Sequence, residues 1–589
     1  MQSNNSNSST GILYEPDSKL SVSVSLGLGL QLMVVGLSVT ILLSMVVFRA
    51  GGVSEAYLIW GVFAAIVVTG LTTVMQSMRI GRFGMGHILL MGTSGTYIAV
   101  CIDALNSGGG SMLGILVLVS GLIQLAISQK LSLFRKILTP TVSGTVLMLI
   151  PISVMSAVFN LLEDVPANQH SMAAPLVAFV TAAVMCGVYL VARGILRLWA
   201  SILGVVAGTL VAGAYGLYDI SRIMEASWVG LPELGWPGLD IHFGSAFWVL
   251  LPGFILAATI SSIRTMSSAV AVHRVSWRRP RAVDYRLVQG AVATDGISNM
   301  FSGLLGAVPN TAYSLGASLS QLTGVASRHV GIAAGLLSLV LAFLPKVIAM
   351  VLAIPGPVFG AYLIVMMAML FMIGVQMIVQ DGLDYQKSLI AGVSFWLGLG
   401  FQSRLIFPDV ATEFAGGLLN NGMTAGGIIA ILMTLFMKMA ESRPKRLTVE
   451  LDLSALTLLM TFLDEFATRQ KWGQQMKDRL NAVGEEVFVT LLDQYEADKQ
   501  TGKRNLLLLA RKVSGGAVLE FVSTTGKGKN LQDQVALLSE QAEEGLLEKE
   551  ISLRLLRHLA ASVRHQQYHG ADIMTVRVDL PKPTAQYTV

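Results

Sequence analysis

The segment PNTAYSLGAS (309–318) and the segment GTSGTY (92–97) decide how this chain of 589 residues folds. Each overlaps an apolar stretch too short to cross a bilayer as a plain helix, because a crossing takes about 20 residues. These stretches, 311–323 and 88–103, are the tenth and the third of 14 apolar segments, so each is third in a set of seven. Short, interrupted segments at matching positions indicate an inverted-repeat transporter.

The two interrupted segments also suggest where a ligand binds. Non-helical backbone at membrane depth is tolerated only where protein or a water-filled cavity surrounds it. Half-helices that begin at such breaks direct their N-terminal N–H groups at a central ligand. The alternative is that the small residues there only let helices pack closely. The matching positions of the two breaks favour a binding site.

The composition divides the chain into two parts. Hydrophobic residues make up 53% of the chain and charged residues 13%, and the mean hydropathy is +0.64. These values exclude a disordered chain, a collagen and an ordinary soluble enzyme. Residues 441–589 hold 20 Lys+Arg and 20 Asp+Glu, so the charge is concentrated there. The sequence therefore predicts a polytopic membrane part followed by a soluble domain.

Fourteen apolar segments are predicted to be spans. They cover 25–48, 56–78, 88–103, 112–129, 139–160, 173–193, 198–218, 246–272, 288–306, 311–323, 329–354, 356–379, 386–402 and 424–440. The loops after the even-numbered segments are rich in Lys and Arg, which are enriched on the cytoplasmic side of membranes. Their basic residues are Arg79, Arg82, Lys130, Arg135, Lys136, Arg193, Arg197, Arg274, Arg278, Arg279, Arg281, Arg286, Arg443, Lys445 and Arg446. This bias predicts that both termini are cytoplasmic.

Several stretches resemble the nucleobase–ascorbate transporters, also called the nucleobase:cation symporter-2 family of xanthine and uracil permeases. The most specific stretch begins ATDGISNMFSGLLGAVPNTAYSLGASLSQLTGVASRHV at residue 293 and continues to residue 346. GILYEPD (11–17), GRFGMGHILLMGTSGTYI (81–98) and LTPTVSGTVLMLI (138–150) are similar to the family as well. The resemblance implies two inverted seven-span repeats, divided into core and gate domains, with short strands from the third and tenth spans beside the substrate. It also implies a homodimer.

The sequence departs from the family at several polar positions. Arg264 stands where the family has a Glu that binds the base, and Ser268 stands where it has an acidic residue or His. Leu315 and Gly316 replace a Gln-Asn or Glu-Asn pair, and Gln31-Leu32 replaces Gln-His. In the third span, Gly95 occupies the position at which the family usually has an aromatic residue. The resemblance places the substrate at these positions and their neighbours, which are Arg264, Ser268, Gly95, Tyr97, Leu315, Gly316, Ala317 and Ser318.

Arg264 changes the expected solute. An arginine has only donors and stays protonated, so it can neither accept N–H bonds from a neutral base nor carry a coupled proton. A charge at the centre of a span costs about 2.5–3.5 kcal/mol and should face a cavity or a partner. We therefore expect a positive pocket for an anion such as urate, deprotonated xanthine, a carboxylate or an inorganic anion. The alternative is that Arg264 pairs with an acidic residue or reaches a solvated face, and contacts no ligand.

Other polar residues of the membrane part are expected to have structural or gating roles. Asp295 and Arg328 are predicted to lie near cytoplasmic ends of spans, where charges can reach the interface. Asn310 and Thr323 belong to the same group, and Gly324 after Thr323 is typical of the purine branch. His87, His273 and His329 are isolated in sequence. We expect neither a metal site nor a cofactor, although H⁺ or Na⁺ could be coupled to transport.

The tail has the pattern of a soluble α+β domain. Strands are predicted at 448–453, 505–513, 518–524 and 572–578, and helices at 456–468, 476–495 and within 531–564. This order resembles the anti-sigma-factor type of histidine-kinase-like ATPase fold. Glu485, Gly526 and Gly528 fit that nucleotide site, but Thr524 stands where the family has the Asp that contacts adenine. The tail is therefore expected to be a degenerate, regulatory or partner-docking module without ATPase activity.

Together these features predict an all-α polytopic membrane protein with a C-terminal α+β domain. The expected parts are a cytoplasmic segment (1–24), a permease domain (25–440), a linker (441–447) and the ATPase-like domain (448–580). The leading hypothesis is a transporter of a purine-like or related anionic solute in a bacterial inner membrane, with no nucleic-acid partner. The alternatives are a facilitative anion transporter or channel on the same scaffold, and a non-transporting sensor that signals through the tail.

Overall fold

The computed structural model divides the chain into two compact units. It describes residues 12–131, 139–163, 165, 172–218, 220–279, 281–380, 382, 384–407, 419, 421–440, 444–497, 505–513, 515–523, 556 and 558–580. The helical unit comprises residues 1–280 and 287–437, and the tail unit comprises residues 281–286 and 438–589.

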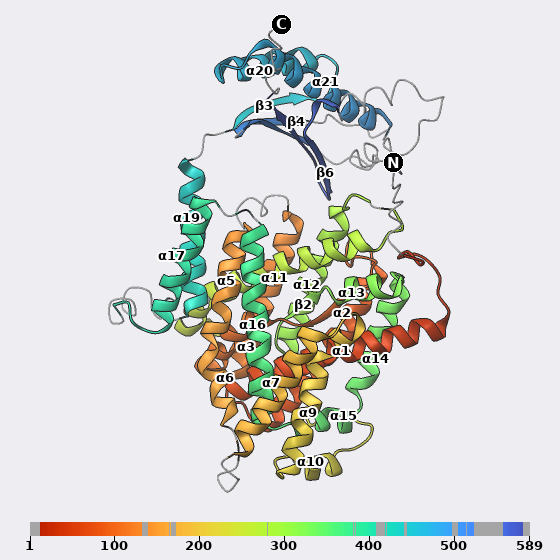
Figure 1. The fold of residues 1–589 in the computed structure, drawn as a ribbon, viewed down its shortest axis with the longest axis vertical. Helices are drawn as coiled ribbons and strands as arrows, with labels where there is room; N and C mark the ends of the chain where they lie inside the picture. The colour runs from red at the N-terminus through yellow and green to blue at the C-terminus, as the bar shows by residue number, and fades with distance from the viewer. Residues whose placement is uncertain are drawn as a thin grey trace, which may run out of the picture. The chain divides into compact units, whose positions relative to one another are not determined.

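The helical unit contains two short strands among many helices (Figure 1). The strands are β1 (Leu90–Thr93) and β2 (Asn310–Tyr313), and a 3₁₀ turn, η1 (Gly95–Tyr97), follows β1. The helices are α1 (Val22–Ala50), α2 (Glu55–Met78), α3 (Ile98–Gln129), α5 (Pro140–Ser153), α6 (Met155–Leu162), α7 (Ala173–Val191), α8 (Ile195–Leu198), α9 (Ala200–Ala214), α10 (Ile220–Glu225), α11 (Ser245–Val275), α12 (Tyr285–Leu305), α13 (Leu315–Thr323), α14 (Arg328–Ala342), α15 (Pro345–Leu352), α16 (Gly356–Gln380), α17 (Tyr385–Gln402) and α19 (Gly422–Ala440).

Each of the 14 predicted segments overlaps a helix of the structure, but the third and the fourth both fall on α3, and several of the helices are interrupted. Seven helices among the described residues are long and apolar enough to cross a membrane, or eight if a bent pair counts as one span. That pair is α14 and α15, which meet at 84°. Within α3 the backbone turns at Gly109, whose φ of 68° is readily adopted by glycine. The chain is therefore a multi-pass membrane protein.

Glycines set the closest helix contacts of this unit. A Cβ added at Gly70 of α2 would lie 2.9 Å from the carbonyl oxygen of Gly335 in α14. In the same way, a Cβ at Gly144 of α5 would lie 2.5 Å from the carbonyl oxygen of Gly374 in α16. Small residues let membrane helices approach closely, because dispersion forces, rather than the hydrophobic effect, hold them together in lipid. At these glycines the packing explanation is sufficient.

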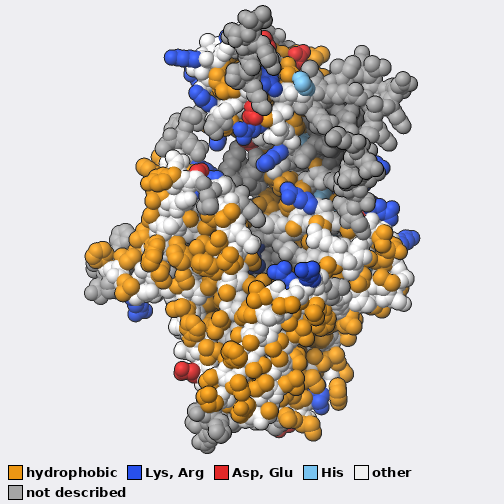
Figure 2. Space-filling model, viewed as in Figure 1, with side chains coloured by type: hydrophobic (Ala, Val, Ile, Leu, Met, Phe, Trp, Pro, Cys, Tyr) orange, Lys and Arg blue, Asp and Glu red, His pale blue; other side chains and the backbone are white. Residues whose placement is uncertain are grey.

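The outer surface of the helical unit is apolar. Figure 2 shows hydrophobic side chains over most of the face in view of this unit. Large apolar side chains such as Phe179, Leu190, Trp396 and Phe436 are at least 70% exposed. A contiguous apolar surface of this kind is unusual for a protein in water and is suited to lipid.

The first described residues dock onto the helical unit. Leu13 N and Tyr14 N donate hydrogen bonds to the carbonyl oxygen of Gly324, at 2.8 and 3.1 Å. Ala326 N donates in turn to the carbonyl oxygen of Tyr14, at 2.8 Å. The segment from residue 12 onward thus covers the turn between α13 and α14, and backbone groups of this turn find partners in it.

The tail unit contains a five-stranded antiparallel sheet in the order β3-β4-β5-β7-β6. Its elements are β3 (Lys445–Glu450), α20 (Ala455–Arg469), α21 (Gln474–Ala497), β4 (Asn505–Val513), β5 (Gly516–Ser523), β6 (Ser562–Tyr568) and β7 (Ala571–Asp579). Leu506 and Leu508 of β4 share a core with Leu463 of α20 and Val487 of α21. Alternate residues of a strand face the same side, so one face of the sheet is covered by the two helices (Figure 1).

The tail prediction was wrong at two places. The strand expected at 448–453 is β3, which begins at Lys445 within the expected linker and ends at Glu450. The helical pattern was expected to continue to residue 564, but residues 562–564 belong to strand β6, whose pairing with β7 outweighs the local helical preference. The predicted helical region 531–555 lies outside the described residues, and so do Thr524, Gly526 and Gly528. Glu485 is exposed on α21.

Candidate functional site

The two short strands pair with each other inside the helical unit. β1 and β2 are antiparallel, with Leu90 opposite Tyr313 and Thr93 opposite Asn310. Both strands are almost fully buried, as non-helical backbone in a membrane protein must be. The helical turn η1 begins two residues after β1, and α13 begins two residues after β2. The strand pair therefore brings two helix N-termini into the interior, where their N–H groups favour a negative charge.

Arg264 of α11 is directed at this crossing. Its Nη1 donates a hydrogen bond to Thr96 Oγ1 in η1, at 3.2 Å. One turn further along α11, Ser268 Oγ donates to the carbonyl oxygen of Ala312 in β2, at 3.2 Å. Residues four apart lie on the same face of a helix, so Arg264 and Ser268 bridge α11 to both crossing segments. Within the described part of the chain Arg264 forms no ion pair.

Asp295 lies in the interior as well, which corrects the prediction that it sits near a cytoplasmic end. It is the eleventh residue of α12, and its side chain is fully buried. Its Oδ2 accepts hydrogen bonds from Thr265 Oγ1, at 2.9 Å, and from Gln124 Nε2, at 3.0 Å. Asp295 interacts electrostatically with Arg264 without being paired to it. The candidate site thus holds one cation and one carboxylate at separate positions.

Amide side chains connect this carboxylate to the strands. Asn299 Nδ2 donates to Gln124 Oε1 at 2.6 Å and to the carbonyl oxygen of Asn310 at 3.1 Å. The backbone N–H of Asn310 donates to Asn299 Oδ1 at 2.6 Å. A residue of α12 therefore holds the first residue of β2 and orients Gln124 of α3. Networks of this kind rigidify a core when their groups find partners.

The predicted substrate residues do not all face the same space. Tyr97 is fully buried, with its ring 6.2 Å from that of Phe254, so it packs between helices. A Cβ at Gly316 would lie 1.9 Å from the carbonyl oxygen of Ile88, so this glycine lets α13 approach the chain before β1. A Cβ at Gly95, by contrast, would meet only Leu370, at 3.9 Å. These three positions were grouped by resemblance, but the structure gives them different surroundings.

The remaining predicted residues also differ in burial and in their hydrogen-bond partners. Leu315 and Ser318 of α13 are half-buried, as Arg264 and Ser268 are, whereas Ala317 is buried. Asn310 is fully buried within the amide network. Thr323 Oγ1 accepts a hydrogen bond from Val325 N at 3.2 Å, at the end of α13. Arg328 Nη2 lies 3.4 Å from Asp17 Oδ1, on the surface. Arg264, Ser268, Gly95, Leu315 and Ser318 therefore remain as candidates for direct solute contact.

Sequence reasoning missed four polar residues of the site. Thr96, Gln124, Thr265 and Asn299 connect the strands, the cation and the carboxylate. A signal was present, because an amide side chain inside an apolar span is expensive and usually indicates function or a specific contact. Their partners could not be found, since these contacts join residues that are up to 175 positions apart.

The strand crossing, the two interior helix N-termini and the buried ionisable residues define a polytopic transporter with a central polar site. The comparison with protein families matches residues 24–404 to the Permease family of xanthine and uracil permeases. The chain belongs to this family, and it is a permease rather than an enzyme. The family assignment does not favour the facilitative anion channel or the non-transporting sensor as alternatives.

Two relatives agree with this membership. The xanthine permease XanP of Escherichia coli is 28% identical over 63% of this chain and 82% of its own length. The uric acid permease PucK of Bacillus subtilis is 27% identical over 67% of this chain and 91% of its own length. The transmembrane domain of the cyanobacterial bicarbonate transporter BicA matches 71% of this chain and 99% of its own, with a TM-score of 0.44 and 16% identity.

Proposed function

We propose that the protein moves a purine-like anion of the xanthine and urate class across the membrane by alternating access. The observation that carries the proposal is Arg264, whose guanidinium lies beside the strand crossing and bonds Thr96. A guanidinium matches planar oxyanions because its donors form a fixed fork. The names of XanP and PucK, a xanthine and a uric acid permease, support the choice of solute class.

Asp295 supports a proton as the coupling ion. When Asp295 is ionised, its charge offsets that of Arg264, and when it is protonated the site carries a net positive charge. An anion and a proton should therefore favour each other's binding, and such linkage is reciprocal. Na⁺ is less suited, because Asp295 Oδ2 is bonded to a hydroxyl and an amide donor and alkali cations need several oxygen ligands. Carrying one proton with one monoanion would make transport electroneutral.

Substitution of Arg264 tests the solute. We expect Arg264→Gln to raise the Kd for urate at least about 30-fold, because truncating one member of a buried charge pair costs about 2–5 kcal/mol. Arg264→Lys keeps the charge but loses the fork, so we expect a smaller rise, about tenfold. Binding of urate, xanthine and uracil to the purified protein is the measurement. If the unmodified protein bound uracil tightly and Arg264→Gln left this affinity unchanged, an anion site would be excluded.

We also propose 14 crossings in two inverted repeats, a bacterial inner membrane and cytoplasmic termini. The support is the Lys and Arg bias of alternate loops, together with the helices that overlap the 14 predicted segments, of which the third and the fourth share α3. The family resemblance supports a homodimer. The apolar outer surface of the helical unit suits a bilayer.

For the tail we propose a regulatory or partner-docking role without ATP hydrolysis. Its support is the pattern of strands and helices and the replacement of the adenine-contacting carboxylate by Thr524, since a hydroxyl is a weaker acceptor than a carboxylate. Titration of the full chain with ATP and magnesium should show no saturable binding below about millimolar ATP, which corresponds to less than about 4 kcal/mol of binding free energy. Saturable binding at micromolar ATP would contradict this proposal.

A further inference from the structure

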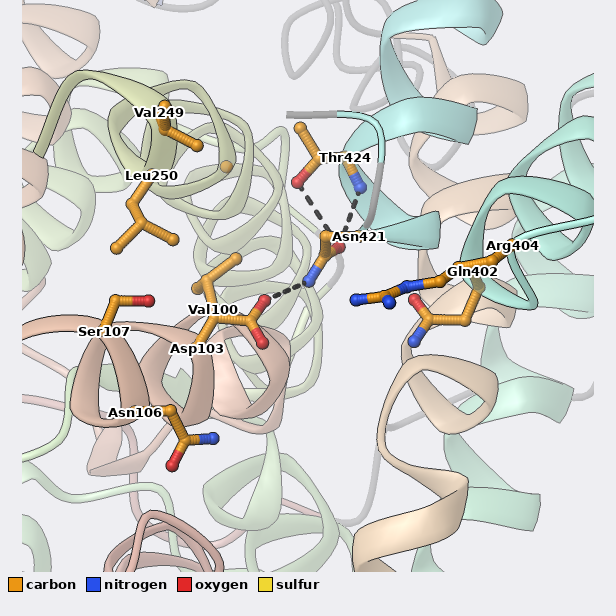
Figure 3. A pocket seen from close by; sticks show the side chains of 11 residues that line it. Val100, Asp103, Asn106, Ser107, Val249, Leu250, Gln402, Arg404, Asn421 and Thr424 are labelled. Carbon is orange, nitrogen blue, oxygen red and sulfur yellow. Dashed lines mark hydrogen bonds between the residues drawn. The ribbon is translucent and has the colours of Figure 1, made fainter. Parts of the chain in front are cut away.

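A cavity lies away from the Arg264 site. It has a volume of about 420 Å³ and is formed by residues of α3, α11, α17 and α19 and the turns beside them (Figure 3). Asp103 follows Thr96 by seven residues, which is about 10 Å of helical rise, and Gly253 precedes Arg264 by 11 residues, about 16 Å. The cavity is therefore a separate space, toward the N-terminal end of α11. Its volume is within the range of small-molecule sites.

The cavity presents a fixed set of donors and acceptors. Asn421 Nδ2 donates to Asp103 Oδ2 at 2.8 Å, and Thr424 N donates to Asn421 Oδ1 at 3.1 Å. Gln402 Oε1 accepts from the backbone N–H of Gly422 at 2.7 Å. These bonds hold the three side chains of Asp103, Gln402 and Asn421 in place. Figure 3 shows the Arg404 guanidinium directed into the cavity, toward the side on which the Asp103 carboxylate lies.

The backbone at Arg404 explains how its side chain reaches the cavity. Arg404 follows the end of α17 with a φ of 52°, and Leu405 N donates to the carbonyl oxygen of Gly400 at 2.9 Å. This left-handed position after a helix is usually occupied by glycine, because a Cβ is strained there. Arg404→Gly would therefore remove the side chain and relax the backbone at the same time.

We propose that this cavity is a second solute site, which holds a planar heterocycle with neighbouring carbonyl and N–H groups before it reaches Arg264. Asp103 would accept from ring N–H groups, and Arg404 would donate to ring carbonyls. Both hydrogen bonds are charge-assisted and therefore strong. The proposal rests on the proposed function for its solute class. Xanthine is a planar heterocycle with neighbouring carbonyl and N–H groups along one edge. With the predicted orientation the cavity opens on the outer side.

Cysteine protection tests the site. In a Cys186→Ser background, Asn106→Cys places a thiol on the exposed wall of the cavity, while Cys101 stays buried. An impermeant maleimide is applied from outside to cells or right-side-out vesicles, with and without xanthine. We expect xanthine to slow labelling at least about fivefold. Protection should persist with Arg264→Gln, and Arg404→Gly should raise the xanthine concentration for half-protection about tenfold, the effect of one lost charge-assisted hydrogen bond.

The variants separate this proposal from the proposed function. Ser403→Gly removes the adjacent side chain of the same turn, which does not line the cavity, and should leave protection unchanged. The second-site proposal would be overturned if xanthine gave no protection. It would also be overturned if Arg404→Gly left the xanthine concentration for half-protection unchanged. Protection that disappears with Arg264→Gln would show that the label reports a movement caused by the central site, and would also overturn it. Failure of Arg264→Gln to weaken urate binding would count against the central site alone.

Discussion

Asp295→Asn is expected to abolish uphill transport while leaving exchange of solute across the membrane intact. With one proton per monoanion, a gradient of two pH units can support about 100-fold accumulation. The variant should accumulate to a ratio of about one, because asparagine cannot bind the coupled proton. The fold should be retained, since an amide oxygen can still accept from Thr265 and Gln124, the two donors that Asp295 Oδ2 engages. Radiolabelled urate uptake and counterflow in proteoliposomes measure both quantities.

The pH dependence of urate binding tests independently whether Asp295 carries the coupled proton. In the unmodified protein the Kd for urate should rise by about tenfold per pH unit above the titration of Asp295, because one proton is linked to one anion. The Asp295→Asn site resembles the protonated state at every pH, so its Kd should not change over the same range. Asp240→Asn makes the same chemical change in a loop and should behave like the unmodified protein. Accumulation that survives in Asp295→Asn would exclude this carboxylate as the coupling group.

Much of the fold was available from the sequence because lipid imposes simple rules. The apolar periodicity located helices in the predicted segments, although 88–103 and 112–129 both fall on α3. The short segments 88–103 and 311–323 contain the paired strands. The breaks within spans were harder to predict. The bend between α14 and α15 and the turn at Gly109 depend on tertiary packing, which an apolar run does not reveal. In the tail, β6 was missed since its sequence continued a helical pattern.

The site was predictable where one residue type is chemically unusual. Arg264 could be selected because a guanidinium in an apolar span needs a partner or a cavity, and the structure directs it to the strand crossing. Asp295 was misplaced because its distance from a loop was judged from the chain alone, whereas burial depends on the neighbouring helices. Tyr97 and Gly316 were included through resemblance, and close packing rather than open space surrounds them.

Asn299→Leu is expected to lower the free energy of unfolding by about 3–5 kcal/mol, the largest stability effect among these variants. Asn299 is fully buried, and its removal leaves the N–H of Asn310 and the Oε1 atom of Gln124 without the partners that Asn299 provides. Each buried group left unsatisfied costs about 1–3 kcal/mol. Leucine branches at the same carbon as asparagine but is larger, so no cavity is left. The loss would come from the unsatisfied polar groups and from overpacking. The thermal unfolding midpoint in detergent is the measurement.

Ser302→Ala is the matched control for this prediction, because Ser302 lies on the same helix, α12, and is equally buried. Its hydroxyl has no hydrogen-bond partner among the described residues, so its removal should be neutral or slightly stabilising. If Asn299→Leu and Ser302→Ala gave the same midpoint, the amide network would not hold β2. A lowered midpoint for Asn299→Leu alone, with weaker urate binding, would show that the strand crossing must be fixed for Arg264 and Asp295 to act on one solute.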